Sequence, residues 1–573
     1  VPASEVSELP VFRSIFLDIG DEQSIDNDLS TYSSHLLNMK HMLAGASDRT
    51  LVLIDEFGSG TEPTIGGAIA EAILERLLTK GCYGVITTHY ANIKYYASNT
   101  EGIANGAMMF DVQNIRPLFR LETGKPRYVN RLRMYYSYDE FVSEMGWDEE
   151  NFNKYSLQEL AYSHFALYRG APLVVCNVFD PAVHKTSVSS EAVSFDAKGA
   201  ASLKHGSVSK LVLKNAESST TYVEGTDYTL DPISGELSRI EGGSLPAEAN
   251  VTAGYDYADV SLVDSTDVIG GINESTGESE GLELIDSVFP QFRLVPGSIL
   301  APRFSEDPAV AVVMAAKADG INGLFKAVAL ADIPTEGEHG VKKYTDVPAY
   351  KQNNNLSDEL LIVCWPKVKL GDRVFGLATH LTGLISQTDA DREGVPYASP
   401  SNKRLEITSI GYPDEKEEGG WKELFLGLDK CNYLNGEGIY TAVNWDGGMK
   451  SWGGRMSAYP SNTDPKDCQD AIRRFFNWYQ STFILTYFQK VDNPLTRRQI
   501  QTILKSEQIR LDGYAAREMI LGGSISFDES DNPTTDLIDG IARFHLRITP
   551  PPANREIDGI FEFDTDNLSV LFS

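Results

Sequence analysis

The sequence has few cysteines and little positive charge. Its five cysteines are far apart, with no C-x-x-C pair: Cys82, Cys176, Cys364, Cys431 and Cys468. This scattering indicates reduced thiols rather than a disulfide framework or a metal motif. The 50 Lys and Arg residues stand against 81 Asp and Glu residues, a net charge of −31. Because a phosphate backbone is bound by clustered cations, composition argues against nucleic acid as the partner.

Long hydrophobic runs are missing as well. No apolar stretch approaches the ~18–20 residues that span a bilayer, and the N-terminal VPASEVSELP lacks the basic and apolar regions of a signal peptide. We therefore predict a soluble protein without membrane insertion. At 573 residues the chain exceeds the ~250–300 residues of a single core, which predicts several domains.

Residues 51–61, LVLIDEFGSGT, have the pattern of a nucleotide-binding strand and the loop after it. The strand would deliver two adjacent carboxylates, one to hold Mg²⁺ and one to polarise the attacking water. A hydroxyl at a helix N-terminus and a histidine after the next strand could contact the γ-phosphate. The predicted site residues are Ser30, Thr31, Asp55, Glu56, Gly58, Gly60 and His89. A G-x-x-x-x-G-K-[ST] phosphate loop is not present in the sequence.

The segments DIGDEQSI, LSTYSSHL, LVLIDEFGSGT and TTHY, in this order, resemble the MutS branch of the ABC-type ATPases over about residues 10–125. The resemblance implies roles for four residues: Ser30 as the signature serine, Asp55 as the Walker B carboxylate, Glu56 as the base and His89 as the switch histidine. Without the phosphate loop and its lysine, the site would lose most of its triphosphate affinity. We expect residues 1–126 to be an inactive partial domain, unless a partner supplies the loop.

The local patterns change along the chain. Residues 1–126 alternate between strands (11–20, 50–54, 84–89) and a helix that begins near Pro63, as in α/β folds. Later patterns predict two helical pieces over 135–171, a strand over 173–179, a small β-sandwich over 188–257 and a flexible exit over 268–281. They also predict buried strands over 298–302 and 360–365, and amphipathic helices over 466–488 and 495–514. Two strands, about 542–549 and 557–564, are predicted at the end, joined by a connection that contains three prolines. The predicted domains are 1–126, 127–187, 188–270, 282–428 and 429–573.

No catalytic constellation is evident in the sequence after residue 129. His164, in AYSHFALY, is predicted to be a packed residue rather than a ligand. NWDGGMKSWGGRM (444–456) predicts a turn around packed Trp445 and Trp452 rather than an anion site. A calcium-binding module on the sandwich is a weaker alternative, because its acidic residues lack a recognised loop spacing; they are Asp227, Asp231, Asp256 and Asp259.

Most of the chain, about residues 129–573, resembles the contractile phage tail sheath proteins. The segments that carry the resemblance are YSYDEFVSEMGW, YSLQELAYSHFALYRGAPLVVCNVFDPA, YVEGTDYTLDPISGELSRI, WGGRM, RRFFNWYQST, NPLTRRQIQTIL and IARFHLRITPPPANREIDGIFEFD. Similar proteins stack as hexameric rings around an inner tube and contract to drive it through an envelope. Terminal arms link neighbours by adding strands to one another's sheets, which needs exposed strand-forming segments but no catalytic site.

These observations predict a multidomain chain of mixed α/β and α+β class. A partial P-loop-type α/β fragment precedes a sheath α/β core with an inserted β-sandwich. We expect an N-terminally truncated sheath subunit that needs no cofactor, assembles in the bacterial cytoplasm into a virion tail, and contacts itself, the tail tube and the baseplate. The predicted inter-subunit residues are Arg473, Arg474, Arg497, Arg498, Phe544, Leu546, Ile560, Phe561 and Phe563. The alternative is a MutS-type ATPase that acts on DNA with ATP and Mg²⁺.

Overall fold

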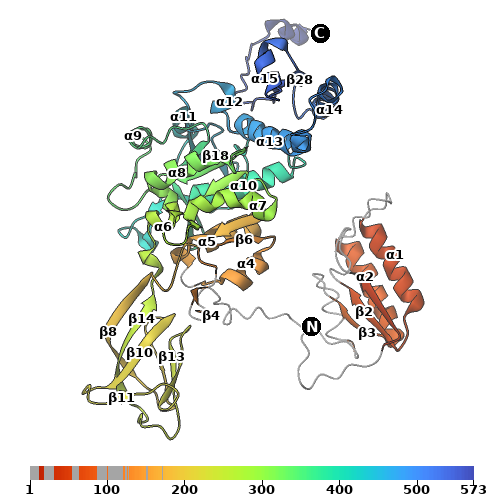
Figure 1. Cartoon of the computed structure of the whole chain (residues 1–573). Helices are drawn as coiled ribbons and strands as arrows, with labels where there is room; N and C mark the ends of the chain where they lie inside the picture. The colour runs from red at the N-terminus through yellow and green to blue at the C-terminus, as the bar shows by residue number, and fades with distance from the viewer. Residues whose placement is uncertain are drawn as a thin grey trace. The chain divides into compact units, whose positions relative to one another are not determined.

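The chain is described by a computed structural model, which divides into a unit of residues 1–111 and a unit of residues 112–573 (Figure 1). The described residues are 12–18, 31–54, 63–86, 100, 121–122, 125–126, 128–149, 152–170 and 172–572. Among them, no helix combines the length and the apolar character needed to cross a membrane.

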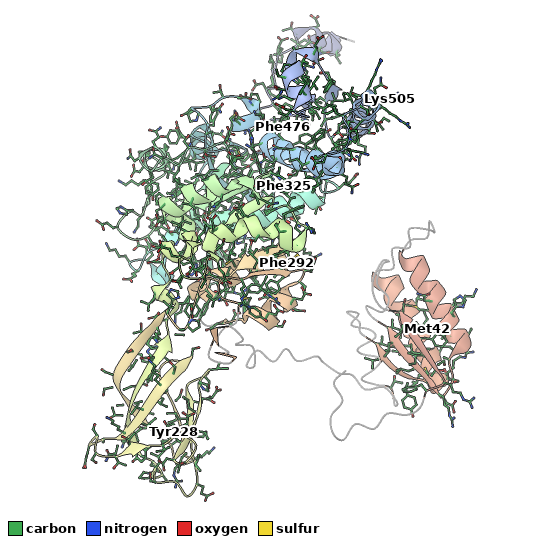
Figure 2. All side chains as sticks on the ribbon, in the orientation of Figure 1. Met42, Tyr228, Phe292, Phe325, Phe476 and Lys505 are labelled. Carbon is green, nitrogen blue, oxygen red and sulfur yellow. The ribbon has the colours of Figure 1, made fainter. Side chains whose placement is uncertain are left out.

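The first unit contains a parallel sheet in the order β1-β2-β3, formed by β1 (Ser14–Asp18), β2 (Thr50–Ile54) and β3 (Tyr83–Ile86). Helices α1 (Thr31–Gly45) and α2 (Pro63–Thr79) cover one face, where Met42, Val52 and Leu74 form the core (Figure 2). The predicted α/β alternation is confirmed, with Pro63 as the first residue of its helix, where the missing N–H is harmless.

A five-stranded sheet forms the centre of the second unit, in the order β17-β20-β21-β26-β27. Its strands are β17 (Ser298–Leu300), β20 (Val328–Asp332), β21 (Leu361–Cys364), β26 (Ile439–Trp445) and β27 (Gly448–Trp452), and only β27 runs antiparallel to its neighbour. Helix α8 (Pro308–Ala318) packs in the core on one face, and α10 (Leu377–Ala390) in the core on the other. The sheet is therefore buried on both sides, as parallel strands require. This confirms the two predicted buried strands.

The β26–β27 hairpin turns at Asp446 and Gly447, both at positive φ. The predicted turn within 444–456 is confirmed, but the prediction that both tryptophans pack around it is wrong for one of them. Trp452 is half-buried and donates to Asn432 Oδ1 at 2.8 Å, whereas Trp445 is 53% exposed. Trp445 is exposed because it pairs with Gly448 at the hairpin tip, next to the turn.

Residues 132–176 form an antiparallel pair, β6 (Leu132–Tyr135) and β7 (Leu173–Cys176), with helices between the two strands. Helix α4 (Tyr138–Met145) begins at Ser137, whose side chain accepts a hydrogen bond from Glu140 N. Helix α5 (Ser156–Ala161) continues as a π-helical turn, Tyr162–Leu167. Two helical pieces and a strand are present, as predicted.

Residues 185–258 form two antiparallel sheets around a shared core. One has the order β11-β10-β14-β8 and the other β12-β13-β9. The strands are β8 (Lys185–Ser194), β9 (Ala200–Ser202), β10 (Val208–Asn215), β11 (Thr221–Tyr222), β12 (Tyr228–Asp231), β13 (Glu236–Arg239) and β14 (Asn250–Ala258). Tyr228, Leu213 and Leu237 are buried between the two sheets (Figure 2).

The predicted flexible exit over 268–281 is wrong. Helix α6 (Ser265–Ile269) starts at a capping box formed by Asp264, and the hairpin of β15 (Gly271–Ile272) and β16 (Ser279–Glu280) follows. Asn273 Oδ1 accepts hydrogen bonds from Ser275 N and Thr276 N inside the hairpin turn. Local side-chain hydrogen bonds thus order a segment that composition alone suggested was a linker.

The C-terminal region contains α13 (Asp470–Tyr487), α14 (Arg497–Ala516) and a hairpin of β28 (Gly522–Ser526) and β29 (His545–Thr549). Both predicted long helices are present, although the first is interrupted at Gln469, which separates it from α12 (Pro465–Cys468). The other elements are β4 (Leu121–Glu122), β5 (Lys125–Pro126), β18 (Asp319–Ile321), β19 (Phe325–Lys326), β22 (Lys367–Leu370), β23 (Arg373–Phe375), β24 (Ser409–Pro413), β25 (Trp421–Glu423), α7 (Val288–Phe292), α9 (Val347–Asn353), α11 (Leu428–Gly436), α15 (Thr534–Ile538) and short 3₁₀ turns.

Candidate functional site

The predicted nucleotide-site residues fall almost entirely outside the described part of the chain; these are Ser30, Asp55, Glu56, Gly58, Gly60 and His89. Thr31 is the first residue of α1, and only its backbone is described. The strand that precedes the two carboxylates, β2, is present and central in its sheet. The roles of these residues therefore stay predictions.

Arg473 and Arg474 lie on the buried face of α13. Arg473 forms an ion pair with Asp467 and donates from Nε to the Lys466 carbonyl at 3.1 Å. Arg474 pairs with Asp389 at the end of α10, 2.5 Å between Nη1 and Oδ2. Both guanidiniums thus connect α13 to other parts of the same chain. A contact of these two residues with a second subunit stays a prediction.

Arg497 and Arg498 occupy the first turn of α14, which Thr496 caps by accepting a hydrogen bond from Gln499 N at 3.2 Å. Both arginines are exposed, as is Lys505 further along the same helix (Figure 2). This end of α14 therefore presents positive charge to solvent on a strongly acidic chain, as a contact with an acidic surface of another subunit would need.

The predicted contact residues of the C-terminus divide into two groups. Phe544 and Leu546 are half-buried: Phe544 packs on Phe527, with ring centroids 5.3 Å apart, and Leu546 packs against the core of α13 and α14. Residues 550–564 form no regular element, and Ile560, Phe561 and Phe563 are 89%, 97% and 81% exposed.

The predicted strand over 557–564 is therefore not formed within the single chain, whereas the strand predicted over 542–549 is present as β29. A strand needs a neighbouring strand to receive its backbone hydrogen bonds, and in the described structure this segment has none. The result is a segment without regular secondary structure whose large apolar side chains are exposed.

Buried carboxylates lie where α5 and the N-terminus of α10 meet the central sheet. Glu159 is fully buried and accepts hydrogen bonds from Gly376 N at 2.9 Å, Thr379 Oγ1 at 3.0 Å and Arg303 Nε at 2.8 Å. A buried charge is tolerated when it is paired and hydrogen-bonded in this way. Glu159 therefore fastens α5 to the first turn of α10.

Asp332, the last residue of β20, is also buried. Its Oδ1 accepts a hydrogen bond from Ala378 N at 2.9 Å, while Oδ2 has no partner among the described residues, and a Cβ on Gly376 would overlap that oxygen. Burial raises the pKa of Asp332 to about 8; the carboxylate of Glu306 adds to the rise, and the Lys367 ammonium opposes it. No local sequence pattern indicates this group of residues, because its members are far apart in the chain.

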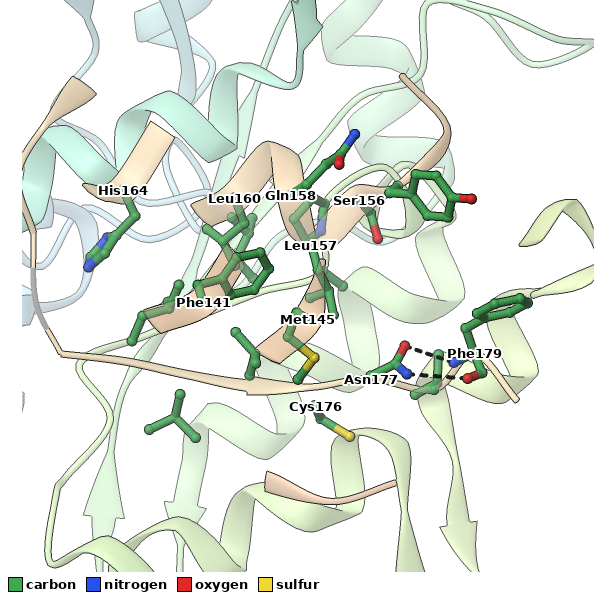
Figure 3. A pocket seen from close by; sticks show the side chains of 18 of the residues that line it. Phe141, Met145, Ser156, Leu157, Gln158, Leu160, His164, Cys176, Asn177 and Phe179 are labelled. Carbon is green, nitrogen blue, oxygen red and sulfur yellow. Dashed lines mark hydrogen bonds between the residues drawn. The ribbon is translucent and has the colours of Figure 1, made fainter. Parts of the chain in front are cut away.

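A cavity of about 1360 Å³ lies between the 132–179 region, the two-sheet region and the central core (Figure 3). His164 lines it from the π-helical turn and is 5% exposed, with no partner for either ring nitrogen among the described residues. Its ring packs edge-on against Phe165, with centroids 5.1 Å apart, and burial lowers the pKa of His164 to about 4. The prediction that it is a packed residue is confirmed.

The acidic residues of the two-sheet region form hydrogen bonds within local structure. Asp227 Oδ1 accepts from Ser244 N at 2.7 Å, and Asp256 Oδ1 accepts from Ser187 Oγ at 2.5 Å. In the described part of the chain, none of the four predicted acidic residues belongs to a group of three or more metal-ligating side chains. The geometry therefore favours carboxylates that stabilise turns and strand ends over a calcium site.

Two family models match separate parts of the chain. One, described as MutS domain V, matches residues 1–127, and the other, described as a protein of unknown function, matches residues 181–266. Endonuclease MutS2 of Shouchella clausii is 49% identical over 126 residues, 22% of this chain. The chain spans only 16% of the length of that relative.

The larger part of the chain matches a different group of proteins. The tail sheath protein of Burkholderia phage BcepMu is 30% identical over 424 residues, which cover 70% of this chain and 84% of that protein. Among solved structures, the sheath tail protein of Desulfitobacterium hafniense aligns with a TM-score of 0.40 at 10% identity, over 70% of this chain and 87% of that one. The sheath of an extracellular contractile injection system in its contracted state aligns with a TM-score of 0.39 at 14% identity, over 53% and 80%.

Proposed function

We infer the function of this chain from its family, because the chain belongs to the tail sheath proteins. It is a structural subunit of a contractile tail sheath, which polymerises around an inner tube and contracts. The observation that carries this conclusion is the match to a tail sheath protein over 84% of that relative's length. The N-terminal residues 1–127 form a second, separate part that resembles MutS domain V.

We propose that the second unit consists of an N-terminal part of the sheath core (127–187), an inserted β-sandwich (188–270), an α/β domain (282–428) and a C-terminal domain (429–573). The two sheets around the shared core of Leu213 and Tyr228 support the insertion, because β8 and β14 enter and leave it side by side. Residues 1–126 are then a partial α/β domain of P-loop type, in line with the parallel order of β1, β2 and β3.

We propose that the exposed segment 550–564 links subunits by adding a strand to the sheet of a neighbour. Two features of the chain support this: the segment forms no strand or helix within the single chain, and its large apolar side chains face solvent. Backbone hydrogen bonds would supply affinity and the apolar side chains specificity. The partners are then further copies of this chain, an inner tube and a baseplate, within a virion tail assembled in the bacterial cytoplasm.

Electron microscopy of the purified chain tests the proposed assembly. We expect rings or tubes at high protein concentration and high salt, since the subunits repel one another through a net charge of −31 that salt screens. A species that stays monomeric under these conditions would count against a sheath role.

We propose that residues 1–573 by themselves do not hydrolyse ATP, because a G-x-x-x-x-G-K-[ST] phosphate loop with its lysine is not among them. A titration of the full chain with Mg²⁺ and ATP is expected to show no saturable binding up to millimolar nucleotide. Saturable binding, with turnover that Glu56→Gln abolishes, would instead support the MutS-type ATPase as a second function.

A further inference from the structure

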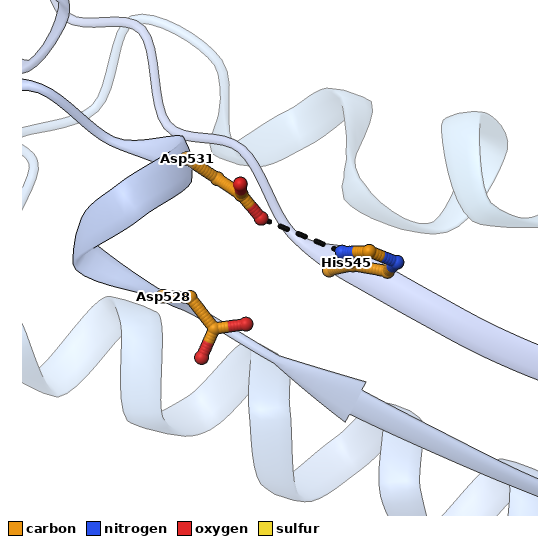
Figure 4. Close-up of side chains that lie close together, drawn as sticks. All are labelled: Asp528, Asp531 and His545. Atoms are coloured by element: carbon orange, nitrogen blue, oxygen red, sulfur yellow. Dashed lines mark hydrogen bonds and ion pairs between the residues drawn. The ribbon is translucent and has the colours of Figure 1, made fainter.

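Three side chains with metal-ligating atoms converge at the base of the β28–β29 hairpin (Figure 4). Asp528 and Asp531 belong to the loop that follows β28, and His545 is the first residue of β29. One ligand atom from each of the three lies within 4.8 Å of the other two. The spacing of these three residues along the chain matches no known metal-binding motif. They come together only because the hairpin forms.

The loop holds these side chains in place through its own hydrogen bonds. Ser526 is paired with His545 across the hairpin, and its hydroxyl donates to Asp528 Oδ2 at 2.7 Å. Asn532 is buried; its Nδ2 donates to the carbonyls of Asp528 at 2.9 Å and Arg543 at 3.0 Å, and its Oδ1 accepts from Arg543 N at 2.6 Å. The backbone that carries the ligands is therefore fixed without an ion.

The distance between the imidazole and the nearer carboxylate suits a shared ion. His545 Nδ1 and Asp531 Oδ2 are 3.4 Å apart, which is long for an N–H···O hydrogen bond. Two ligands that each lie about 2.1 Å from one tetrahedral ion are separated by about 3.4 Å. The pair is thus already at the spacing that one metal would impose, and a ligand atom of Asp528 lies within 4.8 Å of both.

The charge around the group also favours a cation. Among the described residues, neither Asp528 nor Asp531 forms an ion pair with a lysine or arginine; the nearby Arg543 guanidinium pairs with Asp536 instead. An open pocket lined by Asp531, Asp536, Arg543 and His545, among others, adjoins the group. Asp531 and His545 line this pocket, and the Asp531 carboxylate has no lysine or arginine partner among the described residues.

We propose that Asp528, Asp531 and His545 bind one divalent transition-metal ion, with Zn²⁺ as the preferred probe. One imidazole and two carboxylates suit Zn²⁺, whereas Ca²⁺ and Mg²⁺ take oxygen ligands. Three protein ligands leave at least one coordination position for water from the adjoining pocket.

The ion would tie the loop after β28 to the start of β29, the strand that leads into the exposed segment 550–564. Metal binding would thereby stiffen the base of that segment.

Calorimetric titration of the metal-free full chain with Zn²⁺ tests the site. We expect one binding event that millimolar Ca²⁺ or Mg²⁺ does not displace, and that is weakened by at least about 100-fold in His545→Ala and in Asp531→Asn. The exposed His339→Ala is the matched control, and it should bind as the parent chain does. Asparagine has nearly the same shape as aspartate, so Asp531→Asn should leave the hairpin folded. Weaker Zn²⁺ binding by this variant would then result from the loss of a carboxylate ligand.

Tryptophan fluorescence of each variant checks that the second unit remains folded, because all six tryptophans lie there. Loss of Zn²⁺ binding in both site variants, with the fluorescence of the native chain retained, would establish the site. Zn²⁺ binding of unchanged affinity and stoichiometry in both variants, or no Zn²⁺ binding by the parent chain, would overturn it.

Discussion

Replacing Phe561 and Phe563 with serine is expected to prevent polymerisation while leaving the subunit folded. Both rings are almost completely exposed in the single chain, so their removal costs the fold little. In an assembled sheath they would be buried against a neighbour, where each large apolar side chain contributes about 1.5–3 kcal/mol. Sedimentation velocity should then show only monomer at concentrations where the parent chain forms rings or tubes.

The matched control replaces Val183 and Val223 with serine. These two side chains are likewise exposed and apolar, but Val183 lies just before β8 and Val223 lies between β11 and β12 in the two-sheet region. This variant should assemble normally. Two results would contradict the proposed role of the segment 550–564 in linking subunits. One is assembly of the double phenylalanine variant at the same concentrations as the parent chain, and the other is an equal loss of assembly in the control variant.

Replacing Asp332 with asparagine is expected to remove a large pH dependence of stability. The folded-state pKa of about 8 lies above the ordinary value of 3.8, so the folded chain holds a proton that the unfolded chain releases. Stability is then greatest below about pH 4 and falls as pH rises through the window up to about 8, by up to about 1.4 kcal/mol for each pH unit. Asparagine resembles the neutral acid and does not titrate.

Urea unfolding followed by tryptophan fluorescence measures this effect. The difference in free energy of unfolding between Asp332→Asn and the parent chain should be small at pH 4 and should favour the variant by several kcal/mol at pH 9. Comparing the two chains at each pH cancels the contributions of other groups. The exposed Asp372→Asn is the control, and it should follow the parent profile. A pH-independent difference for Asp332→Asn would contradict the raised pKa.

Elements with strong local patterns could be predicted from the sequence. The apolar residues after Pro63 recur at helical spacing, and α2 forms there; the short apolar run 360–365 forms β21. Periodicity and length are enough to predict such elements. The segment 557–564 also has a strand pattern, yet it forms no strand in the single chain. Pairing depends on a partner strand, and local sequence does not supply one.

The candidate sites depended on contacts that no local pattern records. Glu159 meets Gly376 and Thr379 although more than two hundred residues separate them. The sequence predicts inter-subunit contacts for Arg473 and Arg474, but no local pattern indicates that the buried face of α13 places them against Asp467 and Asp389 of the same chain. Asp528, Asp531 and His545 come together only when the hairpin forms.

Electron microscopy of residues 1–573 at high concentration and high salt tests the central claim most directly, since a sheath subunit must polymerise. We predict rings or stacked tubes whose subunits match the second unit in size and shape. Particles that remain monomeric, with the native tryptophan fluorescence that shows the second unit to be folded, would contradict the assignment of this chain as a working sheath subunit.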